Sequence, residues 1–206
     1  MEEKNYTGIV PGQESGFTID TSSDAELDDL SSAQQLFQKA KDRLLDVNNW
    51  HSLSGAPTAN FRLVDASGTE LNRNAEKGDY IRIDVPGPGT DSGKGFDWVQ
   101  IEEMGSSNDK DVESFGFRVR PARRPGGSDD DVSHFYSPSA TSTFTVTRDA
   151  NKITAAIYDR NTKVNTTADS ATEKIRDAVV GTGGILAFSK IQWKKLTDGL
   201  VAKNKQ

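Results

Sequence analysis

The amino-acid sequence predicts an α+β protein: a curved antiparallel sheet of six to seven strands packed on a long C-terminal helix, with an N-terminal amphipathic helix. The spacing of apolar residues carries this prediction. They recur every third or fourth position near both ends of the chain, and every second position over residues 59–158. The first spacing is typical of amphipathic helices and the second of antiparallel strands with one buried face. Because no repeat or long linker divides the chain, we expect residues 17–203 to form a single α+β domain.

The N-terminal part is expected to contain a flexible arm and one helix. Residues 1–16 have the composition of turns and disorder, so we expect a flexible N-terminal arm before a short strand at 17–19. Residues 23–26 and 32–35 both match the capping-box spacing that begins a helix. The helix should end near residues 48–49, and its apolar stripe comprises Leu30, Ala33, Phe37, Ala40, Leu44 and Val47.

Six strands follow, each marked by alternation of apolar and polar residues. Such alternation is typical of antiparallel strands that bury one face, and the helices must then cover the apolar face of the resulting sheet. The apolar members are Phe61 and Leu63; Ile81, Ile83 and Val85; Val99 and Ile101; Phe115, Phe117 and Val119; Phe144 and Val146; and Ile153, Ala155 and Ile157.

A second helical region closes the chain. Residues 170–173 match another capping box, and apolar residues at helical spacing continue to Val179. Glycines within residues 181–184 then interrupt the pattern. Because each glycine costs ~1 kcal/mol inside a helix, a break is favoured there over a kink. The pattern resumes with Ile185, Phe188, Ile191, Trp193, Leu196 and Leu200.

This order of elements resembles the helix-grip fold of the START-like (SRPBCC) superfamily, in which a curved antiparallel sheet wraps a long C-terminal helix. The resemblance covers roughly residues 17–202 and concerns the order of the elements. It implies a cavity between the sheet and the helix that takes an apolar ligand. The long C-terminal helix disfavours a cystatin-like fold, and the helical N-terminus disfavours a lipocalin-like fold.

Composition narrows the possible functions. The chain has no cysteine, which excludes disulfides, thiolate metal sites and cysteine nucleophiles. A net charge of −6 and a pI near 5.0 argue against sequence-independent binding to nucleic acid or anionic lipid. No stretch reaches the ~20 apolar residues of a membrane span. The acidic N-terminus lacks the features of a secretory signal, so a cytoplasmic location is expected.

The glycine-rich residues 86–95 lie between two predicted strands and have some features of a phosphate-binding loop. Such a loop needs a first glycine five positions before the glycine of its Gly-Lys pair, then a hydroxyl and a helix. The glycines before Gly93-Lys94 have the wrong spacing, Gly95 replaces the hydroxyl, and a strand follows. Phosphate binding is therefore rejected here. A plain hairpin connection and a lid over a cavity mouth both remain open.

No catalytic motif or metal site is recognisable. The acidic run at 129–131 lacks the ligand spacing and the glycine of a calcium loop, and pairing with Arg123 and Arg124 across a turn accounts for it. Of the two histidines, His51 follows the first helix and is expected to cap or pack. No metal and no cofactor are expected. The missing catalytic motif favours a non-enzymatic role, with His134 as the candidate acid or base if there is a reaction.

The candidate ligand-binding residues are large apolar side chains expected between the sheet and the last helix. They are either core anchors or the walls of a cavity. The leading hypothesis is a small soluble ligand-binding protein that holds an apolar or amphipathic small molecule there. The residues are Phe117, Phe144, Ile157 and Trp193.

The other face of the sheet is expected to carry a basic and aromatic interaction patch. A solvated outer face accounts for the same residues, since charged side chains are mostly exposed. The alternative function is a protein-interaction or accessory domain that meets a protein partner through this patch. Its residues are Trp98, Arg118, Arg120 and His134, with Arg82 and Tyr136 beside them.

Overall fold

The computed structural model describes residues 4–55, 58–85, 94–127, 132–163 and 181–203, with side chains of the last range described from Phe188 onward. Within these residues, seven strands form one antiparallel sheet in the order β1-β7-β6-β5-β4-β3-β2. The strands are β1 (Phe17–Glu26), β2 (Asn60–Val64), β3 (Tyr80–Asp84), β4 (Asp97–Asp109), β5 (Val112–Pro121), β6 (Thr141–Asp149) and β7 (Lys152–Thr162).

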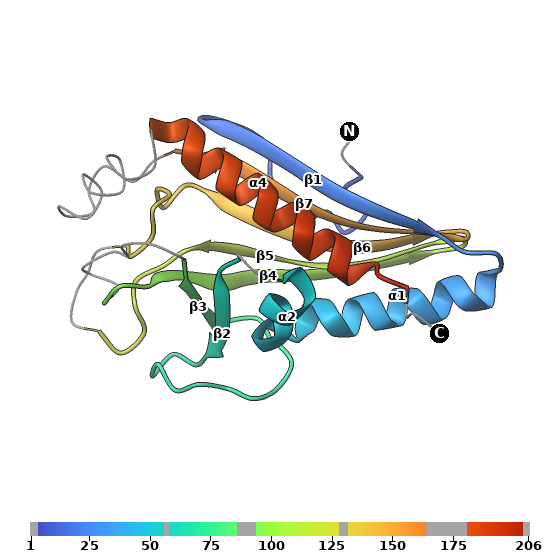
Figure 1. Ribbon diagram of the computed structural model, residues 1–206, viewed down its shortest axis with the longest axis horizontal. Helices are drawn as coiled ribbons and strands as arrows, with labels where there is room; N and C mark the ends of the chain where they lie inside the picture. The colour runs from blue at the N-terminus through green and yellow to red at the C-terminus, as the bar shows by residue number, and fades with distance from the viewer. Residues whose placement is uncertain (1–3, 56–57, 86–93, 128–131, 164–180, 204–206) are drawn as a thin grey trace.

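The sheet curves around the C-terminal helix α4 (Gly181–Leu200), as Figure 1 shows. This helix packs against β1 and β7 and also contacts α1 (Leu30–Leu45) and α2 (Trp50–Ser54). A short 3-10 turn, η1 (Val47–Asn49), joins α1 to α2. The predicted fold class is confirmed: an α+β arrangement in which a curved antiparallel sheet packs on the C-terminal helix, with both long helices on one face of the sheet.

The core lies between the helices and this inner face. Alternate residues along β3–β7 point into it, as the sequence pattern predicts, except where a bulge in β4 between Ile101 and Glu103 shifts the alternation by one residue. Two glycines, Gly105 on β4 and Gly116 on β5, face each other across the opposite, outer face. The buried inner-face residues are Ile81, Val99, Ile101, Phe117, Val119, Phe144, Val146, Ile153, Ala155 and Ile157.

Helix α1 begins through a different cap from the two that the sequence suggests. Asp29 is the N-cap, and its Oδ1 accepts a hydrogen bond of 2.9 Å from the backbone N–H of Ser32. Residues 23–26 lie in β1, because Ser23 pairs with Ala155 at the edge of the sheet. The predicted stripe is buried from Ala33 onward, whereas Leu30 in the first turn is 46% exposed.

Helix α4 includes the glycines at which a break was predicted. Residues 181–184 are helical and lie at the N-terminal end of the described part of α4. The capping box at 170–173 and the stripe up to Val179 lie outside the described residues. At its other end, Nη1 of Arg43 donates to the carbonyl oxygens of Leu200 at 2.9 Å and Ala202 at 2.8 Å. Arg43, from α1, therefore caps α4.

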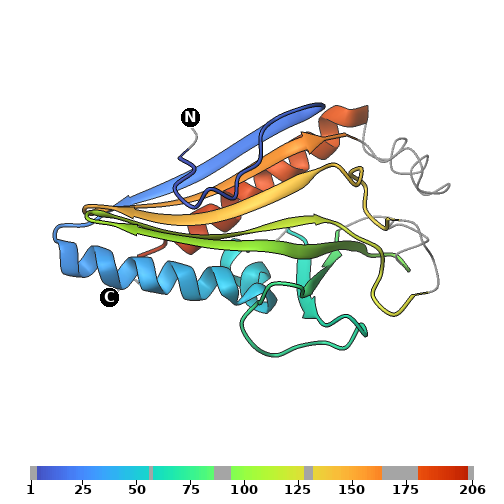
Figure 2. The same ribbon diagram turned by 180° about the vertical axis from the view of Figure 1, so that it is seen from behind.

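The N-terminal segment, residues 4–16, lies on the outer face of the sheet. The sequence predicts a flexible arm for these residues. Figure 2 shows it crossing the outer side of the sheet. Ile9 and Val10 are buried, and Val10 clusters with Tyr158 of β7. A Cβ at Gly105 would lie 2.8 Å from Cγ2 of Ile9, so the missing side chain makes room for the segment. Because the segment is mostly polar, the sequence does not indicate that Ile9 and Val10 are buried against the sheet.

Candidate functional site

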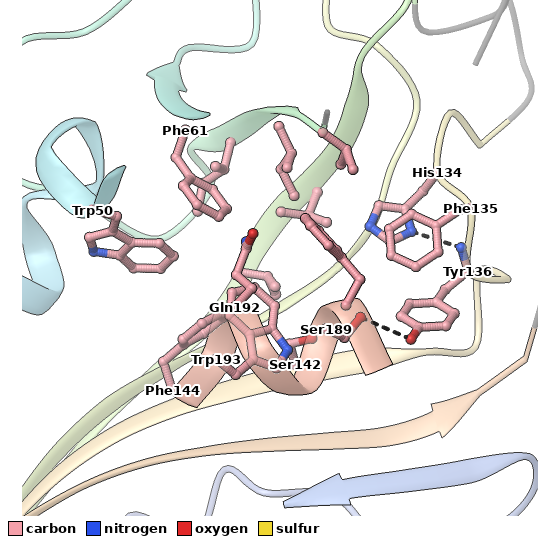
Figure 3. Close-up of a pocket in the computed structure, with 16 residues that line it drawn as sticks. Trp50, Phe61, His134, Phe135, Tyr136, Ser142, Phe144, Ser189, Gln192 and Trp193 are labelled. Atoms are coloured by element: carbon pink, nitrogen blue, oxygen red, sulfur yellow. Dashed lines mark hydrogen bonds between the residues drawn. The ribbon is translucent and has the colours of Figure 1, made fainter. Parts of the chain in front are cut away.

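A cavity of about 50 Å³ lies between the inner face of the sheet and the middle of α4 (Figure 3). Its third wall is the loop segment 134–136, which precedes β6. Aromatic and branched side chains make up most of the lining: Trp50, Phe61, Ile81, Ile83, Val85, Val99, Val119, Phe135, Phe144, Phe188 and Trp193. Polar groups are contributed by His134, Tyr136, Ser142, Ser189 and Gln192.

Trp193 holds α4 against the floor of the cavity. Its ring meets Phe144 of β6 edge to face, with centroids 5.3 Å apart, and stacks on Phe61 of β2 at 6.4 Å. Its indole Nε1 donates a hydrogen bond of 2.9 Å to Oδ2 of Asp159 on β7. Aromatic pairs at these separations add to the free energy of burial, so Trp193 is fixed in both position and rotation.

Two further hydrogen bonds tie α4 to the other walls. The hydroxyls of Tyr136 and Ser189 lie 3.2 Å apart, which links the 134–136 segment to the helix (Figure 3). Oε1 of Gln192 accepts from the backbone N–H of Ala59 at 2.9 Å, just before β2. Each bond joins elements distant in sequence, so the cavity walls are held at a defined separation.

The polar corner of the cavity carries no charge near neutral pH. Burial lowers the pKa of His134 to about 3, and its Nδ1 accepts a hydrogen bond of 2.9 Å from the backbone N–H of Tyr136. The neutral ring therefore carries its proton on Nε2. Burial also raises the pKa of the Tyr136 phenol above its ordinary value. Both residues are thus neutral hydrogen-bonding groups.

Two carboxyl groups lie buried beside this cavity. Burial raises the pKa of Asp159 to about 7, against the opposing effect of hydrogen bonds from Ser142 and Trp193. Burial likewise raises the pKa of Asp97, at the start of β4, to about 7, although the backbone N–H of Phe135 donates to it. Neither carboxyl lines the cavity. They support its walls from behind, one beneath Trp193 and one beneath the 134–136 segment.

The structure brings together two of the four predicted ligand-binding residues. Phe144 and Trp193 line the cavity, whereas Phe117 and Ile157 do not. Phe117 is fully buried and stacks on Trp50 with centroids 6.0 Å apart, so it packs behind the cavity wall. Ile157 is fully buried on β7. Contact of Phe144 and Trp193 with a ligand stays a prediction.

The predicted interaction patch is divided between the two faces of the sheet. Arg118 and Arg120 lie on the outer face and share the carboxylate of Glu102, with Nε of Arg120 at 2.7 Å from Oε2. Trp98 is also on this face, but it is buried. His134 is on the inner side, stacked on Phe135 with centroids 4.5 Å apart. Its predicted outer position was wrong because residues 132–137 form a loop rather than an alternating strand.

The lining residues that were not identified from the sequence include Trp50, Tyr136, Ser189 and Gln192. Trp50 follows the predicted end of the first helix, and Tyr136 was assigned to the outer face. Ser189 and Gln192 lie on α4 among apolar residues, and their polarity on the buried stripe was the signal that could have identified them. Residues 86–93 of the candidate lid at 86–95, and the acidic run at 129–131, lie outside the described residues.

Two negative findings apply to the described part of the chain. No helix there is long and apolar enough to cross a membrane. Nor do three or more His, Asp or Glu side chains gather as potential metal ligands within those residues.

Comparison with known proteins finds neither a family model nor a curated protein that matches this chain. Among solved structures, the crystal structure of Ara h 8.0201 is similar at 14% identity and a TM-score of 0.32, covering 88% of this chain and 99% of that one. Truncated norcoclaurine synthase from Thalictrum flavum gives 12% identity and a TM-score of 0.37, with coverage of 95% and 100%.

Ginseng major latex-like protein 151 from Panax ginseng gives 12% identity and a TM-score of 0.38, covering 84% of this chain and 97% of that one. At such TM-scores these similarities support no statement about function.

Proposed function

We propose that the protein binds a small neutral amphipathic molecule whose apolar part occupies the cavity between the sheet and α4. The observation that carries this proposal is the lining, in which aromatic and branched walls meet one polar corner. Small-molecule sites commonly combine apolar walls with a few fixed polar groups. Burial of apolar ligand surface, at ~25 cal/mol per Å² before the costs of association, supplies the driving force.

The volume of the cavity limits the size of the ligand. A cavity of about 50 Å³ has room for about four water molecules. Sites for drug-sized ligands are typically ~300–1,000 Å³, so this one suits a short alcohol or ketone. A single aromatic ring requires the walls to move apart, and larger molecules require more.

The polar corner selects neutral ligands. The hydroxyls of Tyr136 and Ser189 bond to each other and leave one hydroxyl proton for an acceptor on the ligand. His134 and Tyr136 are both neutral near pH 7, so no lining cation compensates a buried anionic group. Burying an uncompensated charge is costly. A hydroxyl or carbonyl group therefore fits this corner, and a carboxylate does not.

Calorimetry and amide NMR spectra with three probes test this proposal: 1-butanol, cyclohexanol and butyrate. We expect saturable binding of at least one alcohol, with shifts at the Trp193 indole, and no binding of butyrate. Val119→Phe fills the cavity and should abolish binding. Ile191→Phe is the matched control, because Ile191 lies on α4 and is 58% exposed, and this variant should bind the alcohol as the wild type does. Alcohol shifts that persist in Val119→Phe, or no saturable binding by any probe, would refute the proposal.

The alternative function, a protein-interaction surface on Arg118 and Arg120, has less support. Nη1 of Arg118 donates to the carbonyl oxygen of Ile9 at 2.6 Å, and Nη2 lies 2.6 Å from Glu103. Arg120 bonds to Glu102 and to the carbonyl oxygen of Pro138 at 3.2 Å. These guanidinium groups are used within the protein, where they hold the N-terminal segment and the loop before β6.

A further inference from the structure

A second concave site lies on the outer face of the sheet, on the side opposite the ligand cavity. It is a groove of about 240 Å³ beside the start of β4 and the part of β3 that pairs with it. Arg82 and Trp98, which pair across these two strands, form its floor, and their neighbours Ile81 and Val99 face the inner cavity. The groove is lined by Ser67, Gly68, Arg82, Lys94, Phe96, Trp98, Arg124, Pro125 and Gly126.

The groove carries three positively charged side chains, those of Arg82, Lys94 and Arg124. None of its lining residues is acidic. Arg82 lies over the ring of Phe96, 4.8 Å from its centroid, and pairs at 2.8 Å with Glu70, which is 57% exposed. No ion pair involves Lys94 or Arg124 within the part of the chain that the structure describes. Nε of Arg124 is buried and has no hydrogen-bond partner among the described residues. A buried donor without a partner is unfavourable, and an acceptor that reaches it would offset this cost.

The wall beside Arg124 is formed by two turns that touch through their backbones. Gly126 has φ of +65°, and a Cβ there would lie 2.7 Å from the carbonyl oxygen of Ser67. Gly68 has φ of +86°, and its Cβ would lie 3.2 Å from the carbonyl oxygen of Pro125. Glycine alone permits this approach, so the wall has a fixed position.

We infer that this outer groove binds a small organic anion through a carboxylate or phosphate group. Guanidinium groups match both oxyanions and bind them with short, charge-assisted hydrogen bonds. The half-buried ring of Phe96 contributes apolar surface for the organic part of the ligand. This inference is independent of the proposed function, because the inner cavity excludes charge and the outer groove attracts it.

Calorimetric titration of the full chain with phenyl phosphate, benzoate and inorganic phosphate tests the inference. We expect saturable binding of phenyl phosphate or benzoate, and a comparison of the two identifies the preferred oxyanion. Arg124→Gln should weaken binding by at least about tenfold, the loss expected for one charge-assisted hydrogen bond. Lys39→Gln removes the same charge from an exposed site on α1 and should change affinity less than about twofold.

Two further variants locate the bound anion in the outer groove. Gly126→Ala moves the groove wall and should weaken binding, while the cavity-filling Val119→Phe should leave anion binding intact. Equal losses in Lys39→Gln and Arg124→Gln would show attraction by general charge and overturn the inference. No saturable binding by the wild type would also overturn it. Anion binding that appears only after the three acids at 129–131 are changed to asparagine would also overturn the inference. In that case these acids, and not a ligand, would occupy the groove of the wild type.

Discussion

Replacing Gly199 with alanine tests how closely α4 approaches α2. Helix propensity alone favours alanine over glycine by about 1 kcal/mol inside a helix. In this structure, however, a Cβ at Gly199 would lie 2.5 Å from the carbonyl oxygen of Leu53 and 3.0 Å from its carbonyl carbon. The obstacle is backbone at the end of a short helix, not the tip of a flexible side chain.

The magnitude follows from the displacement that this clash requires. Ordinary contact begins at 3.4 Å, so α2 and α4 must separate by about 0.9 Å, from 2.5 Å. The movement disturbs buried Trp50 on α2 and the hydrogen bonds of Arg43 to the end of α4. Overpacking of this kind costs about 1–3 kcal/mol, to which disturbed hydrogen bonds add about 1 kcal/mol. After the gain in propensity, we expect Gly199→Ala to destabilise the fold by about 1–3 kcal/mol.

Urea unfolding followed by circular dichroism measures this change. Gly12→Ala is the matched control, because nothing lies within 4 Å of a Cβ there, and it should stay within about 0.5 kcal/mol of wild type. If Gly199→Ala proves about 1 kcal/mol more stable than wild type, the helix propensity of alanine outweighs any clash with the backbone of Leu53. The close approach of α4 to α2 would then be refuted.

Three further predictions concern the polar supports of the fold and its N-terminal segment. Burial raises the pKa of Asp159 to about 7 from 3.8, so the folded protein retains a proton that the unfolded chain releases between these values. The free energy of unfolding should therefore fall as pH rises from about 4 to 7. Urea unfolding across this range should show a smaller pH dependence in Asp159→Asn, in which only the contribution of Asp97 remains. An unchanged pH dependence in this variant would contradict the assignment to Asp159. Arg43→Gln should lower the free energy of unfolding by about 1–2 kcal/mol through loss of the α4 cap, with Lys39→Gln as an unaffected control. Gly105→Ala should raise amide exchange in residues 4–16 while β5 and β6 stay protected; equal protection of these residues in the variant and the wild type would show that the segment does not need the glycine.

The fold was predictable because hydrophobic spacing reflects the period of each element. Strict alternation in residues such as Phe117 and Val119 identifies strands irrespective of their partners. The N-terminal segment was not predictable in this way. Ile9 and Val10 have no periodic neighbours, and the space for Ile9 depends on Gly105 of β4, where a Cβ would lie 2.8 Å from Cγ2 of Ile9.

Two of the four predicted ligand-binding residues line the cavity, because hydrophobic spacing gives the direction of side chains only on regular helices and strands. Trp193 and Phe144 lie on regular elements whose spacing gives their direction. His134 lies in a loop whose path is set by tertiary contacts, such as the bond between the hydroxyls of Tyr136 and Ser189. Spacing also cannot tell a residue that lines a cavity from one packed behind it, which is why Phe117 was expected in the lining.

The positions of the three tryptophans have a practical consequence. Trp50 and Trp193 line the inner cavity, and Trp98 lines the outer groove. Each compartment therefore contains its own intrinsic chromophore. In Trp98→Phe the remaining ultraviolet emission would report only on the interior, and quenching experiments could follow occupancy of the two compartments separately without any attached dye.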